Sequence, residues 1–294
     1  MKRSLLLSIL LLGFTIHAFS IKDTLLTSPV ACKQGEWELV FADEFNAASL
    51  DSAVWITWFP YTDGGRDNCG FCRTHGNEGQ VYLDENVIIA DSILKIVAKN
   101  DTITWMGEQR YYSSGMIHSR YAFGQGRYEV RAKLPGGMGF WPAIWTFGQI
   151  SAEVDIMEAG MQHPRRYHTS IHNWNSKKME HNRKNVGTNL STDFHVFAME
   201  WDPDIIRFFI DEKEVWALSR YTSPRGRNLK KCELKPGRYG LNPFFPHPDE
   251  KLYLIINLAI GNPHTPFTKT PNEKTAFPAQ MEVDWVRVYR RGAE

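Results

Sequence analysis

Apolar and polar residues alternate along several stretches of the chain, the period of β-strands with one buried face. Gly, Pro, Asn and Asp, which favour turns, separate these stretches. The pattern predicts strands at residues 38–45, 87–98, 127–133, 194–201, 205–210, 252–258 and 281–289. Helix patterns are nearly absent, and no repeat or linker interrupts the alternation. We therefore expect an all-β sandwich or jelly roll that forms one domain over residues 21–294.

The first twenty residues have a different pattern. Lys2 and Arg3 precede an apolar run at residues 5–16, and Ala18 and Ser20 are small residues of the kind found at signal-peptide cleavage sites. The run is shorter than the roughly 20 apolar residues of a membrane-spanning helix. Residues 1–20 are predicted to be a signal peptide, and the mature protein to have no membrane span and to be secreted, periplasmic or attached to the cell surface.

Composition and charge restrict the function further. The chain is 43% hydrophobic and 13% aromatic, which supports a large core, and its formal net charge is +1. Because this charge gives no overall field that attracts a polyanion, nucleic acid is not an expected partner. Two basic stretches, residues 177–184 and 225–231, lie between predicted strands. We interpret them as solvated loops, with contact to an anionic polymer as the alternative.

The four cysteines are interpreted in the light of export. Cys69 and Cys72 form a C-x-x-C without the second pair or spaced histidines that a zinc site needs. In an oxidising compartment this spacing predicts a local disulfide. For Cys32 and Cys232 the sequence leaves both a disulfide and two free thiols open.

The stretch EVDIMEAG at residues 153–160 places three carboxylates in an otherwise apolar strand. In a regular strand Glu153 and Asp155 share one face, whereas Glu158 points to the opposite, apolar face. An unpaired carboxylate there would be costly. One extra residue, a β-bulge around Ile156-Met157, would return Glu158 to the face of the other two.

Three crowded carboxylates suit acid–base chemistry. They cannot all ionise at their usual pKa, so one retains a proton beside an ionised neighbour. A retaining glycosidase uses two carboxyl groups about 5–5.5 Å apart in this way. A calcium site or a solvated lectin-like face would also explain the acidic residues. Nearby aromatic and polar residues favour a sugar cleft instead, and these are Trp141, Trp145, His172, Asn173 and Trp174.

The motif EVDIME resembles the catalytic signature of glycoside hydrolase family 16 in its bulged, laminarinase-like form. The resemblance extends over nearly the whole mature chain. The matching segments occur in the family's order: ELVFADEF at 38–45, GNEGQVY at 76–82, SGMIHSRYAFGQGRYEVRAKLP at 114–135, GFWPAIW at 139–145, FHVFAMEWDP at 194–203, LYLIINLAIGN at 252–262 and VDWVRVYR at 283–290.

This resemblance implies a β-jelly roll of two curved antiparallel sheets with a concave substrate cleft. It implies a retaining endo-glycosidase that acts on a β-linked polysaccharide or oligosaccharide without a catalytic cofactor. We expect a monomer, although the sequence leaves the oligomeric state open. By motif position, Glu153 is similar to the nucleophile and Glu158 to the general acid/base. Asp155 would hydrogen-bond the nucleophile and help to set its protonation.

The resemblance also implies a substrate-binding set and a metal site. The residues expected to contact sugar are Trp141, Trp145, His172, Trp174, Asn77 and Glu78. Many family members bind a structural calcium ion away from the cleft, through residues that match Glu44 and Asp284 here. Ordinary surface carboxylates are the alternative for this pair.

Departures from the laminarinase pattern bear on the substrate. The segment before the catalytic strand is short, at residues 146–152, and Ala159-Gly160 replaces the common aromatic. Residues 58–72 resemble an inserted loop that shapes the cleft. A β-1,3- or mixed β-1,3/1,4-glucan is the leading substrate, and an endo-β-galactosidase acting on agar, porphyran, keratan or mucin galactans is the alternative. A transglycosylase and a non-catalytic sugar-binding protein stay open, although all three carboxylates are present.

Overall fold

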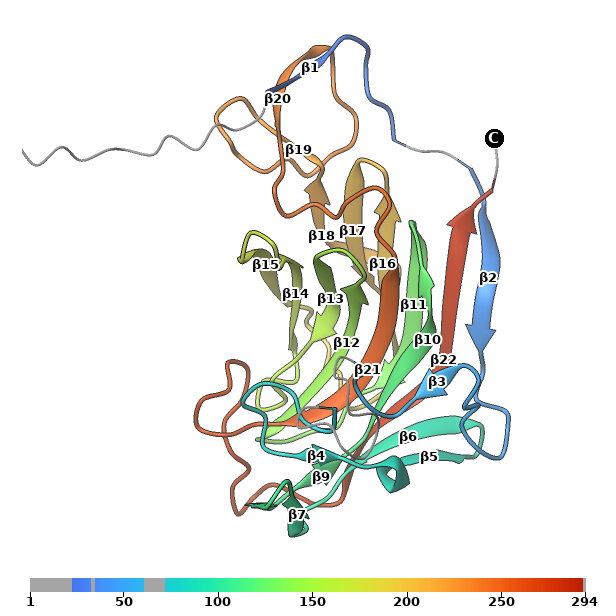
Figure 1. Ribbon diagram of the computed structural model, residues 1–294, viewed down its shortest axis with the longest axis vertical. Helices are drawn as coiled ribbons and strands as arrows, with labels where there is room; N and C mark the ends of the chain where they lie inside the picture. Colours follow the sequence, from blue (N-terminus) through green and yellow to red (C-terminus); the bar gives the residue numbers. More distant parts are fainter. Residues whose placement is uncertain (1–22, 33–34, 61–71, 293–294) are drawn as a thin grey trace, which may run out of the picture.

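Two antiparallel β-sheets packed face to face form most of the computed structural model (Figure 1). The structure describes residues 23–32, 35–60 and 72–292. The first sheet, here called the cleft sheet, consists in spatial order of β15 (Lys178–Asn185), β14 (Arg166–Asn173), β13 (Ala152–Glu158), β12 (Phe140–Gly148), β21 (Leu252–Ile260), β10 (Met116–Phe123) and β3 (Trp55–Ile56).

The second sheet, here called the outer sheet, packs against the cleft sheet. It consists of β18 (Lys213–Ser219), β17 (Ile205–Ile210), β16 (His195–Asp202), β11 (Gly126–Lys133), β22 (Ala279–Arg291), β6 (Ile93–Ala98) and β5 (Val87–Ala90), with β2 (Trp37–Asp43) paired to β22. The long strand β22 bonds β11 along one edge, and β2 and β6 share its other edge.

Short elements complete the described chain. They are β1 (Asp23–Leu26), β20 (Gly237–Leu241) and β19 (Tyr221–Thr222) in a three-stranded sheet, the pair β4 (Val81–Tyr82) and β9 (Ser113–Ser114), the hairpin β7 (Ile103–Trp105) and β8 (Glu108–Arg110), and the 3₁₀ helix η1 (Asp84–Asn86). Within the described ranges, no helix is long and apolar enough to cross a membrane.

The core lies between the two sheets, where alternate apolar residues of both meet. Val154 of β13, Ile256 of β21, Phe197 of β16 and Val286 of β22 are all buried in one continuous cluster. Because each strand turns one face to this cluster, its other residues project outward, and those of the cleft sheet form the surface described below. The predicted sandwich of two antiparallel sheets is confirmed.

Most predicted strands match observed ones, and residues 205–210 coincide with β17. Two predictions are wrong. Residues 87–98 form two strands, because Asp91 and Ser92 adopt positive φ angles of 58° and 56° and make a tight turn. The basic stretch 177–184, expected to be a loop, forms most of β15 at the edge of the cleft sheet.

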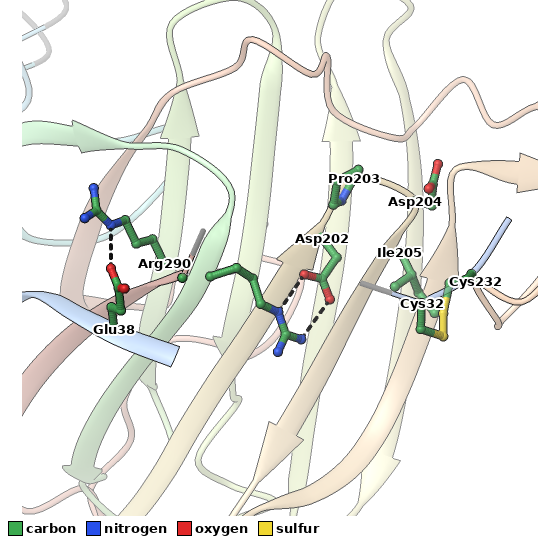
Figure 2. Close-up of a pocket in the computed structure, with 11 residues that line it drawn as sticks. Cys32, Glu38, Asp202, Pro203, Asp204, Ile205, Cys232 and Arg290 are labelled. Carbon is green, nitrogen blue, oxygen red and sulfur yellow. Dashed lines mark hydrogen bonds and ion pairs between the residues drawn. A yellow bond between two sulfur atoms is a disulfide. The ribbon is translucent and has the colours of Figure 1, made fainter. Parts of the chain in front are cut away.

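A hollow of about 750 Å³ lies at one end of the outer sheet (Figure 2). Four of its charged side chains form two pairs: Arg290 donates to Glu38 at 3.1 Å, and Arg291 donates to both carboxylate oxygens of Asp202 at 3.2 and 3.3 Å. Opposite charges thus neutralise each other here, which is consistent with a structural role for these residues.

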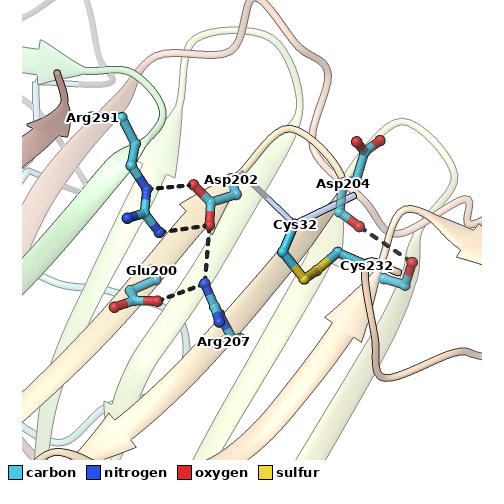
Figure 3. Close-up of a disulfide and its surroundings, with 8 residues drawn as sticks. Cys32, Glu200, Asp202, Asp204, Arg207, Cys232 and Arg291 are labelled. Atoms are coloured by element: carbon cyan, nitrogen blue, oxygen red, sulfur yellow. Dashed lines mark hydrogen bonds and ion pairs between the residues drawn. A yellow bond between two sulfur atoms is a disulfide. The ribbon is translucent and has the colours of Figure 1, made fainter. Parts of the chain in front are cut away.

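The disulfide Cys32–Cys232 borders this hollow and joins residues 200 positions apart in the chain (Figure 3). Ile205 and Ala217 are buried beside it. The sequence left this pairing open, and the structure forms it. Cys72 is also disulfide-bonded. Cys69, the partner predicted for Cys72, lies outside the described residues, as do the predicted signal peptide and most of the 58–72 loop.

Replacing both cysteines, Cys32→Ser with Cys232→Ser, should lower the free energy of unfolding by about 2–5 kcal/mol, because a bond that closes so long a loop restricts the unfolded chain. Activity per folded molecule should not change, since the disulfide lies on the outer sheet. Urea titration monitored by tryptophan fluorescence measures the effect. An unchanged unfolding midpoint would show that this disulfide does not stabilise the fold.

Candidate active site

Strand β13 has one extra residue in its pairing register with each of the two strands that flank it. Ile156 has no partner in the register with β12, and the pairing with β14 shifts between Asp155 and Glu158. Ile156 and Met157 are both fully buried in the core, as two consecutive residues of a bulge can be. The bulge expected around Ile156-Met157 is therefore present, and it returns Glu158 to the face of Glu153 and Asp155.

The three carboxylates line a cleft of about 440 Å³ on the face of the cleft sheet that points away from the core. Predicted residues in its wall are Trp141, Trp145, His172, Trp174 and Glu78, and other wall residues include Phe59, His75, His168, His181, Asn257 and Phe267. Aromatic rings and acidic groups thus share one concave surface, as a sugar-binding cleft requires.

Asp155, between the two glutamates, is only 4% exposed and is held by β14. Its Oδ2 accepts a hydrogen bond from Ser170 Oγ and lies 3.0 Å from His172 Nε2. Among the hydrogen bonds of the described residues, none joins Asp155 to Glu153, although the sequence predicted one. Alternate residues of a strand lie about 6.6 Å apart, so Asp155 turns to the neighbouring strand for partners.

Glu153 sits where several groups influence its ionisation. Burial and the nearby charge of Asp155 raise the pKa of Glu153 to about 7. Trp174 Nε1 donates to Glu153 Oε2 at 2.9 Å, and this bond, like the charge of His172, favours the ionised form. At neutral pH a substantial fraction of Glu153 is therefore a carboxylate, the form that can act as a nucleophile.

Glu158 holds its proton more strongly. Burial, and then the charges of Asp155 and Glu153, raise its pKa well above its usual value. Trp141 Nε1 donates to Glu158 Oε1 at 3.0 Å, which only partly offsets the loss of water. The cleft therefore contains a protonated carboxyl beside an ionisable one, the pair that acid-assisted bond cleavage requires.

His172 connects the acidic groups to the aromatic wall. Burial lowers the pKa of His172, but the hydrogen bond and charge of Asp155 and the charge of Glu153 outweigh it, so the net shift is upward. The ring stacks on Trp174 with 5.9 Å between centroids and 10° between planes. Trp174 is 52% exposed, so about half of its surface stays accessible to a ligand.

Trp145, which was expected to contact sugar, lines the cleft but is largely covered by other side chains. It is only 6% exposed, because Phe59 and His75 pack over it at 6.1 and 5.6 Å between ring centroids. Its indole Nε1 donates to Asn257 Oδ1 at 2.8 Å. Trp145, Phe59 and His75 thus form one packed side of the cleft, with Trp145 at its base. Trp141 and Trp174 are the more accessible rings.

Of the expected pair Asn77 and Glu78, only Glu78 lines the cleft. Its Oε2 accepts from Tyr82 Oη at 2.8 Å, and its Oε1 lies 3.5 Å from His75 Nδ1. Asn77 is exposed and uses its backbone oxygen to accept from Asn262. Glu78 therefore orients the wall residues around it, whereas Asn77 does not lie in the cleft wall.

Several cleft residues were not predicted from the sequence, among them His75, Asn257, Ser170 and Phe267. Asn257 was the most detectable, because it is a polar residue within the apolar run LYLIINLAI of β21. Phe267 comes from a segment between strands without a periodic pattern. Only the fold brings it against Trp141, 4.9 Å away between ring centroids.

The residues expected to hold calcium do not form a cation site. Arg287 donates to both carboxylate oxygens of Glu44 at 2.8 and 3.1 Å, and Arg131 pairs with Asp284. An arginine at each carboxylate opposes a divalent cation, so this arrangement does not fit calcium. In the described part of the chain, one cluster brings three ligand atoms within 4.8 Å, namely Glu153, Asp155 and His172. His172 already contacts both carboxylates, and Glu153 also accepts from Trp174.

Comparison with known proteins agrees with this geometry. The model of glycosyl hydrolases family 16 matches residues 77–232, more than half of the chain. A β-glucanase of Rhodothermus marinus is 32% identical over 91% of this chain and 90% of its own length. A keratan-sulfate endo-1,4-β-galactosidase of Sphingobacterium multivorum is 27% identical over 91% of this chain and 58% of its own length.

A solved structure also agrees. The laminarinase catalytic domain of Thermotoga maritima superposes with a TM-score of 0.71 and 25% identity, over 88% of this chain and all of that domain. The predicted jelly-roll fold is thereby confirmed. With a family model that spans most of the cleft sheet and a relative similar over nearly its whole length, the chain belongs to glycosyl hydrolases family 16 and is a glycoside hydrolase.

Proposed function

We propose that this enzyme cleaves internal bonds of a β-linked polysaccharide with retention of configuration. The observation that carries the proposal is the bulged strand β13, which brings Glu153 and Glu158 to one cleft and gives both carboxyls raised pKa values, that of Glu158 being strongly raised. A nucleophile and an acid on one face suit double displacement.

In the first step, the ionised Glu153 attacks the anomeric carbon and forms a covalent glycosyl ester. The bond to the leaving oxygen breaks, and Glu158 gives that oxygen its proton. The hydrogen bond from Trp174 to Glu153 supports the carboxylate before attack. The departing chain carries away the proton, so Glu158 is left as a carboxylate.

In the second step, a water molecule resolves the ester. Glu158, now ionised, takes a proton from the water while the oxygen of the water forms a bond to the anomeric carbon. The bond to Glu153 breaks, its carboxylate is restored, and the product has the β configuration of the substrate. Asp155 stays in place throughout, held by Ser170 and His172, and its charge keeps the pKa values of both glutamates raised.

The proposed substrate is a β-1,3- or mixed β-1,3/1,4-glucan, which the similarity to the Rhodothermus β-glucanase and the Thermotoga laminarinase supports. A β-linked galactan is the second candidate, because the keratan-sulfate galactosidase is similar over 91% of this chain. We further propose a single catalytic domain, active as a secreted monomer without a catalytic cofactor.

Incubation with a substrate panel tests this proposal. Laminarin, barley mixed-linkage glucan, agarose, porphyran, keratan sulfate and mucin glycans are treated with the protein, and released oligosaccharides are identified by mass. Products from the glucans, with the β-anomer seen first by NMR, are expected. Products from galactans alone would show that the substrate is a galactan and not a glucan. An initial α-anomer would contradict retention.

Variants of the two glutamates should distinguish the acid from the nucleophile. Glu158→Ala should lose about 10³-fold in kcat on polysaccharide but much less in the first step on an aryl glycoside, whose leaving group needs no proton. Added azide should then yield a β-glycosyl azide. Glu153→Ala should be inactive on both substrates and give only an α-glycosyl azide. The opposite pattern would mean that the two assignments must be exchanged.

The pH dependence should follow the two carboxyls. Because Glu153 must be ionised and Glu158 protonated, kcat/KM should rise through a pKa of about 7 and fall at higher pH. Trp174→Phe removes a hydrogen bond that stabilises ionised Glu153, so the acidic limb should move to higher pH. An acidic limb that stays in place in the Trp174 variant would show that this bond does not set the protonation of Glu153.

A further inference from the structure

One arm of the cleft carries positive charge. Strands β14 and β15 pair without a bulge, with His168 opposite Arg183 and Arg166 opposite Asn185. Since His168 and His181 line the cleft, the alternation of side chains places Arg166 and Arg183 on that same face. This surface is here called the cationic arm; it is formed by Arg166, His168, His181 and Arg183, and its permanent charge comes from the two arginines. It lies beside Glu158, which pairs with His168 across β13 and β14.

Among the residues that the structure describes, no carboxylate pairs with the arginines of the cationic arm. Arg166, His181 and Arg183 are exposed and make no ion pair with any residue that the structure describes. Glu180 of the same strand occupies the alternate position and points to the other side of the sheet. The pKa of His168 is lowered to about 4 by burial and by the charges of this arm, first Arg183.

Arginines on the outer sheet are arranged differently. Arg127 donates to Glu129 and Glu200 at 2.5 and 2.8 Å, and Arg287 binds both oxygens of Glu44. Side chains that could form such pairs are absent from the cleft-facing positions of β14 and β15, which hold no carboxylate. Arg166 and Arg183 occupy diagonal cross-strand positions, whose backbone sites lie roughly 7–8 Å apart, and their guanidinium groups are therefore left to bind an external anion.

A sugar ring can be placed beside this arm. The ring of Phe267 contacts His168 at 4.8 Å and Trp141 at 4.9 Å between centroids. Trp141 donates to Glu158 and His168 lies opposite Arg183, so the three rings form an aromatic ridge that leads from Glu158 to the arginines. A pyranose packed on this ridge would direct its substituents towards Arg183 and Arg166. Guanidinium groups bind sulfate and carboxylate oxygens in pairs, with defined geometry.

We propose that the cationic arm binds an acidic substituent, a sulfate ester or a carboxylate, on the sugar chain that occupies the cleft. This inference rests on the proposed function, and it concerns the substituent rather than the backbone, which is a glucan or a galactan. The enzyme then favours an acidic polysaccharide over its neutral counterpart, and added salt reduces that preference because it screens the two arginines.

Binding to an inactive protein tests the proposal independently of turnover. Glu158→Gln is titrated with matched pairs of ligands: sulfated and unsulfated laminarin oligosaccharides, keratan sulfate and its desulfated form, and sialylated and desialylated mucin glycans. We expect the acidic member of at least one pair to bind about tenfold more tightly, as one charge-assisted contact provides. The sulfated and sialylated pairs distinguish a sulfate from a carboxylate.

Two further variants in the same background assign the effect to the arm. Arg166→Gln with Arg183→Gln should abolish the preference, whereas Lys184→Gln, on the opposite face of β15, should retain it. Equal affinities within every pair, or equal loss of preference in the Lys184 control, would overturn the proposal. If the wild-type protein cleaves none of these ligands, the proposed hydrolysis fails while the binding comparison still decides this inference.

Discussion

The single extra residue in β13 is the constraint on which the site depends. Without it, the alternation of the strand would turn Glu158 into the core, where a carboxylate is costly. The bulge is fixed from the core side, since Ile156 and Met157 are both fully buried among residues of the two sheets. The same packing that holds the sandwich together therefore sets the position of the acid relative to the nucleophile.

The chemistry of the cleft opposes the stability of the fold. Burial and mutual repulsion raise the pKa of Glu153 from 4.5 to about 7, and that of Glu158 well above 4.5. Between the unfolded and folded pKa values the native state binds more protons, so stability decreases as the pH rises through this range. The large apolar core and the disulfide offset this cost. The unfavourable burial of carboxyl groups is concentrated in the cleft, where it supports proton transfer.

Much of the active site could be predicted from short motifs in the sequence. The carboxylate spacing in EVDIMEAG predicted the bulge, and nearby motifs located Trp141, His172 and Trp174 in the cleft wall. Pairings between distant segments could not be inferred in the same way. Trp145 is covered by Phe59 and His75, which lie some seventy or more positions earlier in the chain. Nothing around Trp145 itself signals that contact.

The cationic arm shows the same limit. The charges at residues 177–184 were evident, but a run of Lys, His and Arg has the composition of a loop. Only its pairing with β14 makes it a strand and sorts its side chains between two faces. The arginine partners of Glu44 and Asp284 were hidden for a related reason: Arg287 and Arg131 meet these carboxylates only through the pairing of strands in the outer sheet.

Titration of the individual carboxyls tests the central claim most directly. With ¹³C-labelled glutamate, and Glu153→Gln and Glu158→Gln to assign the signals, NMR follows each carboxyl as the pH changes. The account predicts that Glu153 loses its proton first, near pH 7, and that Glu158 retains its proton to higher pH. If both carboxyls titrate near their usual value of 4.5, or if Glu158 ionises first, burial and crowding do not define an acid and a nucleophile in this cleft.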